Sequence, residues 1–439
     1  MKNELSAPIF WTWDHSTNWV KNQTGKQTAG SNNMYSKPAE LFKEDYCRAI
    51  LWAEQNGVAA VGLAGLLRDF HNGLDDARYI ADFAKEHNVI LYPIVGLYAY
   101  GGVYYEGDTH WSLNNFLRDN PECFAVDDDG KPRIASWPYM PKKVYHGCFS
   151  NQKMLDHVLR SLEWLFKEIP SLGGISMETS DTGVCQCEAC RSKRTMPADT
   201  LSYDDMAIYY PKAIEAVRSI KPDAMIICET YSHFLPKNMK TPAWFGNGIP
   251  EEAAELLSAI PKDAYISWVA DKMMKFDDWK EDDVAPAILK GHKQIMRGHY
   301  GTYWEGSSRH RLEIWKIRKM CRLSAYSDID RISLFGEGAS FNVNDELNYL
   351  AGVYFSKNPM ASIEDFQKDV AAELLGSYEA AGMYFRMNEE LNNKNLETNY
   401  MEAIGDYIAS STGEVRRRWI WFGSYYASFR WDKEHNITR

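Results

Sequence analysis

Acidic residues directly follow several short apolar runs of the chain, and two of them suit the chemistry of a carboxylate pair. Glu178 follows the run 173–177, and Glu305 follows the run 301–304. Two carboxyl groups across a glycosidic bond can divide proton donation and nucleophilic or base chemistry between them. Asp181 offers an alternative local partner, which would steer a substrate acetamido group while Glu178 acts as the acid. We therefore predict Glu178, Glu305 and Asp181 as catalytic residues.

Further polar and aromatic residues follow the same apolar runs and are expected around the same substrate-binding mouth. Several like charges in one cleft raise the pKa of some carboxyl groups, which keeps an acid protonated near neutral pH. The alternative for any single acid is structural, and Glu178 could instead pair with Arg191 or Lys193. The predicted substrate-binding residues are Asp14, His15, Arg68, Asp69, His71, Tyr98, Trp137, Glu229, Asp271, Trp304 and Glu337.

Aromatic residues are abundant, at 13% of the chain with 15 Trp and 26 Tyr. Their apolar faces and polar tips suit sugar rings, but they suit a large aromatic core equally. Arg68 could bind the carboxylate of a uronic acid through its bidentate fork, or could hold Asp69 in place. Candidates for stacking against a sugar, of which about half are expected in the core, are Trp11, Trp13, Trp19, Tyr98, Tyr104, Trp137 and Trp304.

Three cysteines form a C-x-C-x-x-C motif at Cys185, Cys187 and Cys190. Thiolates this close together can share one Zn²⁺ at about 2.3 Å each. Cys148, in the long segment before the fourth predicted strand, is the expected fourth ligand. Four cysteines and no open position would make a structural metal site. Free buried thiols or one disulfide are the alternatives.

The apolar runs alternate with helix-like segments, and eight such pairs predict an α/β protein with a closed TIM (β/α)₈ barrel. No G-x-G-x-x-G motif follows the first run, which disfavours an open dinucleotide-binding sheet. In a barrel the active site lies at the C-terminal ends of the strands, where the acidic residues are expected. Strands are expected at 8–13, 58–63, 89–95, 173–177, 224–228, 264–269, 301–304 and 329–335. Helices are expected at 38–56, 74–88, 152–168, 203–220, 250–260, 284–296 and 311–327.

Only helix-like segments remain near the C-terminus, at 345–354, 362–387 and 403–426. We therefore predict two units, a catalytic barrel over residues 1–341 and a helical C-terminal extension over residues 342–439. The long segment from 96 to 151 interrupts the alternation, and loops of this length usually have a function or cover a site.

The bulk properties of the 439 residues restrict the partners of the protein. The net charge of −11 disfavours nucleic acid and anionic membrane surfaces, but it is compatible with a small-molecule or oligosaccharide substrate. No apolar run reaches the length of about 20 residues that a membrane span needs. No signal peptide is visible, so a cytoplasmic location is expected, or a periplasmic one if a leader was removed. No organic cofactor and no particular oligomeric state is indicated.

The order Glu178, C-x-C-x-x-C, Glu305 resembles the retaining barrel glycosidases, most of all the zinc-containing β-galactosidases. This resemblance implies that Glu178 is the acid/base, Glu305 the nucleophile and Cys148 the upstream metal ligand. Met177 stands where that family has Asn. The run from CFSNQ to GGISMETSDTGVCQCEAC also resembles the barrels of bacterial glycan-degrading proteins related to hexosaminidases and α-glucuronidases. The specific motifs cover only about residues 148–190, so they imply polysaccharide or glycan degradation without a particular sugar.

Three hypotheses for function follow. The first is a glycoside hydrolase, and the second is a carbohydrate-binding barrel without catalysis. The third is a metal-dependent sugar isomerase or lyase, although no H-x-H or H-E-x-x-H spacing supports it. In this third case the metal site would be built from Asp14, His15, Asp69, His71, Glu229 and Glu305.

Overall fold

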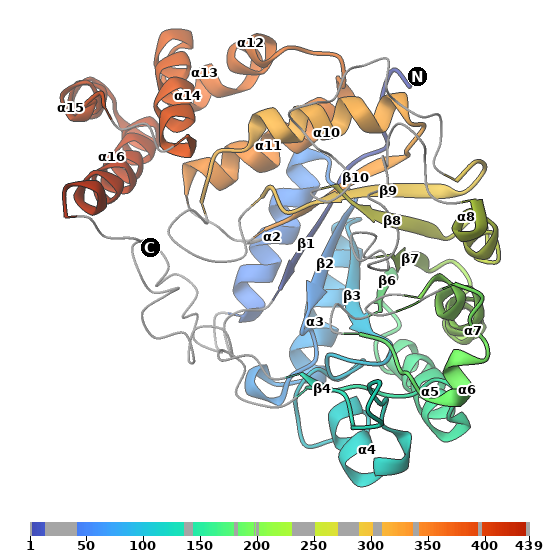
Figure 1. The fold of residues 1–439 in the computed structure, drawn as a ribbon. Coiled ribbons are helices and arrows are strands. Elements are labelled where there is room, and N and C mark those ends of the chain that lie inside the picture. The colour runs from blue at the N-terminus through green and yellow to red at the C-terminus, as the bar shows by residue number, and fades with distance from the viewer. Residues whose placement is uncertain are drawn as a thin grey trace.

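The computed structural model describes residues 2–13, 42–135, 144–179, 183–196, 198, 202–230, 251–270, 289–301, 310–336, 342–393 and 397–435. Within them, eight parallel strands close into a barrel whose neighbouring strands follow one another along the chain (Figure 1). The predicted TIM (β/α)₈ barrel is therefore confirmed. Its strands are β1 (Ile9–Trp13), β2 (Ala60–Ala64), β3 (Ile90–Gly96), β6 (Gly174–Glu178), β7 (Met225–Glu229), β8 (Tyr265–Val269), β9 (Lys293–Gly298) and β10 (Arg331–Phe335).

Helices cover the outside of this barrel, because strands buried on both faces need an apolar layer outside as well as inside. The side chain of Asn151 accepts a hydrogen bond from the backbone of Met154 and so begins α5, and Ser202 begins α7 in the same way. The bounds of α5 and α7 are those predicted from the sequence. The outer helices are α2 (Phe42–Asn56), α3 (Leu74–Glu86), α5 (Gln152–Glu168), α7 (Tyr203–Ile220), α8 (Glu251–Leu257), α10 (Ile314–Tyr326) and α11 (Val343–Lys357).

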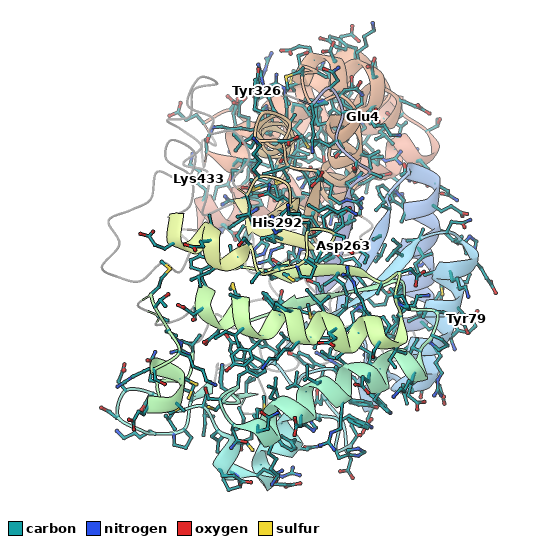
Figure 2. The ribbon with its side chains drawn as sticks, turned by 90° about the vertical axis from the view of Figure 1, so that its right-hand side faces the viewer. Glu4, Tyr79, Asp263, His292, Tyr326 and Lys433 are labelled. Atoms are coloured by element: carbon teal, nitrogen blue, oxygen red, sulfur yellow. The ribbon has the colours of Figure 1, made fainter. Side chains whose placement is uncertain are left out.

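The two ends of the barrel differ in what they carry. Figure 2 shows Asp263 and His292, which precede β8 and β9 and so mark the N-terminal ends of the strands, with Tyr79 of α3 at the outer edge. The opposite end carries Glu178 and Glu229, each the last residue of its strand. Active sites of barrels lie at this C-terminal end.

The seventh strand lies earlier in the chain than predicted. Residues 301–304 were expected as this strand and 284–296 as the preceding helix, but β9 covers Lys293–Gly298 and pairs with both β8 and β10. The run KQIMRG contains one lysine and one arginine, which conceal the strand from a search for apolar runs. Glu305 therefore lies seven residues beyond the end of β9 and not directly at it.

The long segment between β3 and β6 has structure of its own. It contains α4 (Leu113–Asp119) and a small antiparallel pair, β4 (Ile134–Ala135) with β5 (Val144–Tyr145). The short helix α6 (Glu188–Arg191) follows β6 and lies near this segment (Figure 1).

Helices beyond β10 gather on the side of the barrel where α10 and α11 lie, drawn in orange and red in Figure 1. They are α12 (Ile363–Phe366), the π-helical turn η6 (Gln367–Ala371), α13 (Ala372–Leu375), α14 (Tyr378–Asn392), α15 (Met401–Ser410) and α16 (Gly413–Glu434). The single helices expected at 362–387 and 403–426 are wrong, because the backbone breaks at Gly376 (φ 101°) and Gly413 (φ 55°). The division at residues 341 and 342 stays a prediction.

In the part of the chain that the structure describes, no helix has both the length and the apolar character that crossing a membrane requires.

Candidate functional site

Glu178 ends β6 with its carboxylate inside the barrel, where it meets the side chain of Arg297 from β9. The Nη1 atom of Arg297 donates a hydrogen bond of 3.2 Å to Oε1 of Glu178. Both side chains are almost fully buried, with 1% and 2% of their surface exposed. Burial removes the solvation of both charges, so an ion pair of this kind is stable only where its geometry and hydrogen bonds compensate for the lost solvation. Arg191 and Lys193, the alternative partners predicted for Glu178, make other contacts. Arg191 pairs with Asp128 at 2.6 Å, and Lys193 donates a hydrogen bond to Ser150.

Glu229 ends the neighbouring strand β7 and faces the same guanidinium group. Its Oε2 atom lies 3.6 Å from Nε of Arg297, beyond good hydrogen-bond distance, and it makes no hydrogen bond to the described residues. Burial raises the pKa of the Glu229 carboxyl, and the charge of Arg297 and the hydroxyl of Ser267 offset only part of this rise. The two carboxyl groups therefore share one cation but differ in how closely it holds them.

A small polar cavity lies inside the barrel beside these carboxyl groups, with room for about one water molecule. Four buried polar atoms without a hydrogen bond in the described residues belong to residues of its lining: Nε1 of Trp11, Oγ of Ser176, Oγ of Ser267 and Oε2 of Glu229. The ring of Trp11 also lies 4.9 Å from the guanidinium carbon of Arg297, a cation–π contact. Residues with unsatisfied polar atoms thus line one small cavity beside the two carboxyl groups.

Tyr210 of α7 fixes the ends of the two carboxylate-bearing strands from outside the barrel. Its hydroxyl donates to the carbonyl of Glu229 at 2.5 Å and lies 3.1 Å from the carbonyl of Met177. Burial raises the pKa of Tyr210 well above its usual value, so the hydroxyl stays protonated and able to donate. The backbones of β6 and β7 are therefore held together directly behind Glu178 and Glu229.

The polar residues after β2 contact the tyrosine-rich loop that follows β3. The hydroxyl of Tyr104 donates to Asp69 at 2.5 Å, and the backbone of Asp108 donates to the second oxygen of the same carboxylate. Arg68 is fully buried with its guanidinium 4.3 Å from the ring centre of Tyr105. These contacts attach the loop to β2, and the predicted role of Arg68 and Asp69 in substrate binding stays a prediction.

Three other predicted residues are placed by the structure within aromatic packing. His71 stacks on the ring of Phe42 at a centroid distance of 3.5 Å, and Tyr98 packs edge-on against Phe149 at 5.2 Å. Trp11, one of the stacking candidates, is 4% exposed and lies in the barrel interior. Both Trp11 and Tyr98 are therefore buried. The side chain of Trp13 lies outside the described part of the structure. The same holds for these whole predicted residues: Asp14, His15, Trp19, Trp137, Asp181, Asp271, Trp304, Glu305 and Glu337.

Arg297 was not among the residues predicted from the sequence. It belongs to the strand that the prediction misplaced, and it lies 119 residues from Glu178 along the chain. One signal was available, since an arginine two positions after Ile295 falls on the same, inward face of a strand that otherwise reads as apolar. A buried arginine inside a barrel needs an acidic partner, which Glu178 and Glu229 supply.

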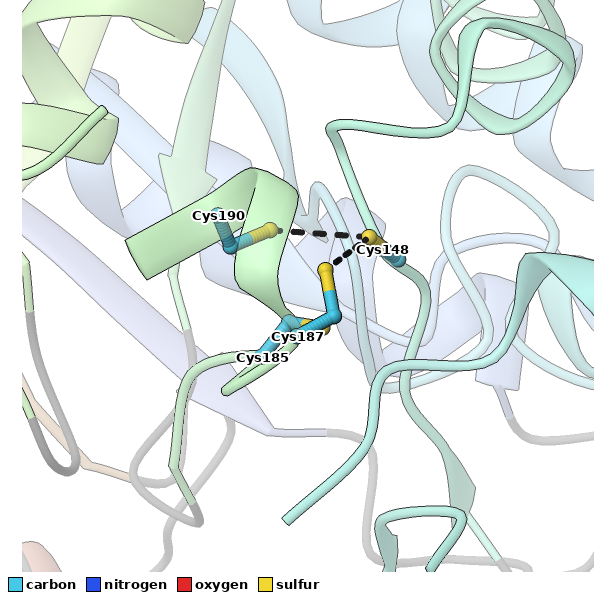
Figure 3. A group of neighbouring side chains, drawn as sticks. All are labelled: Cys148, Cys185, Cys187 and Cys190. Atoms are coloured by element: carbon cyan, nitrogen blue, oxygen red, sulfur yellow. Dashed lines mark hydrogen bonds between the residues drawn. The ribbon is translucent and has the colours of Figure 1, made fainter. Parts of the chain in front are cut away.

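The four cysteines of the predicted metal site do come together (Figure 3). The sulfur atoms of Cys148, Cys185, Cys187 and Cys190 all lie within 4.8 Å of one another. Cys148 Sγ is 3.7 Å from that of Cys187 and 3.5 Å from that of Cys190. Four thiolates at about 2.3 Å from one Zn²⁺ would stand about 3.8 Å apart in a tetrahedron. This group of residues could therefore hold a metal ion, and all eight cysteines of the chain are free of disulfide bonds.

The surroundings favour negative charge on one of these four sulfur atoms, that of Cys185, whereas hydrogen bonds to Cys185 and Cys190 raise the pKa of Cys148. Hydrogen bonds from the thiols of Cys148 and Cys190 lower the pKa of Cys185, and the backbone N–H of Val126 donates to Cys185 Sγ at 3.4 Å. N–H donors stabilise thiolate, the form that binds metal. Cys148 precedes α5 whereas the other three follow β6, so a bound metal would connect the long segment before α5 to the chain just after Glu178.

The chain is similar to one protein family and to several solved structures. A family described as "Domain of unknown function (DUF4838)" matches residues 65–242. No curated protein matches the chain. Among solved structures, a Thermobaculum terrenum O-GlcNAc hydrolase mutant is 10% identical (88% of this chain, 80% of that one, TM-score 0.47). A β-N-acetylhexosaminidase from Bacteroides fragilis NCTC 9343 is 12% identical (86% and 71%, TM-score 0.46). The endo-1,4-β-mannanase from Rhizomucor miehei is 11% identical (76% and 85%, TM-score 0.42).

Proposed function

We propose that this protein is a glycoside hydrolase that acts on an oligosaccharide or glycan at the C-terminal end of its barrel. The observation that carries the proposal is the buried pair Glu178 and Glu229, two strand-end carboxyl groups on either side of the guanidinium of Arg297. Burying two acids and one base costs several kcal/mol unless their geometry compensates. The stability of the core alone therefore does not explain why these three side chains lie there. A pair of carboxyl groups in different environments is what glycoside hydrolysis uses.

A metal-dependent isomerase or lyase has less support. Within the described ranges, the four cysteines are the only group of His, Cys, Asp and Glu side chains arranged to hold a metal ion. A site of four thiolates leaves no open position for a substrate, so a metal held there would be structural. We infer that this metal is zinc, which thiolate ligands in tetrahedral geometry favour.

Hydrolysis of a panel of aryl glycosides and natural oligosaccharides tests the proposal. Turnover by the wild-type protein that falls by about 10²-fold or more in Glu178→Gln supports it. Glu215→Gln is the matched control, because Glu215 is an exposed glutamate on α7 and its substitution removes the same charge. Sugar binding without turnover across the panel would contradict a hydrolase and support a carbohydrate-binding barrel.

A further inference from the structure

Glu178 and Glu229 are at equivalent positions but in unequal environments. The strands β6 and β7 pair in register, with Met177 opposite Cys228, so the two glutamates that follow are neighbours on the inner face of the barrel. Glu178 accepts a charge-assisted hydrogen bond from Arg297 at 3.2 Å, whereas Glu229 approaches the same guanidinium only to 3.6 Å. An ion pair with a hydrogen bond favours the ionised carboxylate, and burial without one favours the neutral acid.

The neutral form of Glu229 could also donate a hydrogen bond into the small cavity. Oε2 of Glu229 lines the small cavity and makes no hydrogen bond to the described residues, although the side chain is 5% exposed. A buried carboxylate oxygen without a donor is costly, whereas a protonated carboxyl can donate to a water molecule or to a substrate oxygen. The two acids of the same type therefore lie in environments that favour the charged form of Glu178 and the neutral form of Glu229.

We propose that Glu229 is the proton donor of this site, that Glu178 is its ionised partner, and that Arg297 is the positioning residue that sets the difference between them. This inference rests on the proposed glycoside hydrolase function. It assigns the acid to a residue that the sequence had placed in substrate binding or in the metal site of the third hypothesis, and it assigns Glu178 the role expected for Glu305.

The reaction then runs as follows. Glu229 donates its carboxyl proton to the glycosidic oxygen while the bond from this oxygen to the anomeric carbon breaks, and the leaving group departs as an alcohol. Glu178, as a carboxylate, either attacks the anomeric carbon or takes a proton from the attacking water. Water supplies the hydroxyl group of the new reducing end, and its remaining proton restores the carboxyl pair to its starting state.

The experiment compares two substrates of the same sugar, one with a good leaving group such as dinitrophenolate and one with a poor leaving group such as an alkoxide. A proton donor matters only when the leaving group is poor. We expect Glu229→Gln to lose about 10²-fold or more in kcat/KM on the alkyl glycoside and little on the dinitrophenyl glycoside. Glu178→Gln should lose activity on both, and Glu215→Gln on neither.

The pH profile gives a second measurement that a structural role would not change. In the wild type, kcat/KM on the alkyl glycoside should fall at high pH as the proton donor ionises, and Glu229→Gln should lack this fall. If Glu229→Gln does not fold, Glu229→Asp retains a titratable carboxyl group and should show the same dependence on the leaving group. Arg297→Lys should move the pH profile, since it changes the cation between the two acids.

The outcomes separate the two proposals. Hydrolysis by the wild type with equal losses on both substrates in the Glu229 variants would overturn the assignment of Glu229 and leave the hydrolase proposal intact. Absence of hydrolysis by the wild type on every substrate would overturn the hydrolase proposal and the role of Glu229 with it.

Discussion

Arg297 reaches across the barrel interior from β9 to Glu178 on β6, and its Nη1 atom lies 3.2 Å from the Glu178 carboxylate. The same guanidinium is 3.6 Å from Glu229 on β7 and 4.9 Å from the ring of Trp11 on β1. One side chain thus contacts residues from three other strands of the barrel. The consequences of removing it follow from the two acids that it would leave behind.

We expect Arg297→Met to lower the free energy of unfolding by about 3–5 kcal/mol near neutral pH, because it leaves the buried Glu178 carboxylate without its cation. The deficit should shrink as the pH is lowered, since protonation of Glu178 removes the unpaired charge. Urea unfolding at several pH values measures both effects. Arg416→Met is the control, because Arg416 is exposed on α16. Equal, small losses in the two variants would argue against a stabilising buried ion pair.

Tyr210→Phe should cost about 1–3 kcal/mol of stability, because two buried carbonyl groups lose a shared donor. It should also lower kcat, since the ends of β6 and β7 would no longer be held together behind the two glutamates. Thermal unfolding and steady-state kinetics measure the two effects. Tyr209→Phe is the matched control on the same helix, because its hydroxyl interacts with the side chains of Ser150 and Lys193 and not with the ends of β6 and β7. A Tyr210→Phe variant as stable as the wild type would contradict this role.

The cysteine site predicts about one zinc ion per chain in the purified protein, measurable by elemental analysis. We expect Cys148→Ser to lose the metal and to lower the melting temperature, because it removes the ligand that connects the segment before α5 to the chain after β6. A strong chelator should destabilise the wild type and leave Cys148→Ser nearly unchanged. Cys47→Ser serves as the control, since Cys47 lies on α2. A wild-type protein that folds without metal, and whose stability does not change when the chelator is added, would refute the prediction.

His157 of α5 should make stability depend on pH. Burial first, and then the charges of Arg160 and His110, lower the pKa of His157 from 6.5 to about 4. Between these values the unfolded chain binds the proton more readily than the folded one, so stability is lost as the pH falls from about 6.5 to about 4. His157→Phe, which keeps the stacking on Phe116, should reduce that loss by about 2 kcal/mol. Unfolding curves of both proteins across this range measure it, and parallel pH dependences would show that His157 does not contribute.

Much of the fold could be predicted from the sequence because its signals are local. Seven of the eight strands read as apolar runs, and α5 and α7 have the bounds predicted for them, since the side chains of Asn151 and Ser202 cap their first turns. The C-x-C-x-x-C motif likewise brought three of the four metal-binding candidates together within six residues. The breaks at Gly376 and Gly413 were missed, because a glycine within a helical pattern ends the helix only where the tertiary packing requires a turn.

The sequence by itself determined the alternation of strands and helices, the capped ends of the central helices, the cysteine motif and the position of acids at strand ends. Only the tertiary structure decided which of these acids meet. Closure of the barrel brings inward-facing side chains of β6, β7 and β9 into one interior, although they are far apart along the chain, and no local pattern encodes that meeting. The two carboxyl groups differ in their distances, 3.2 and 3.6 Å, to a single guanidinium, and such distances exist only once the barrel has closed.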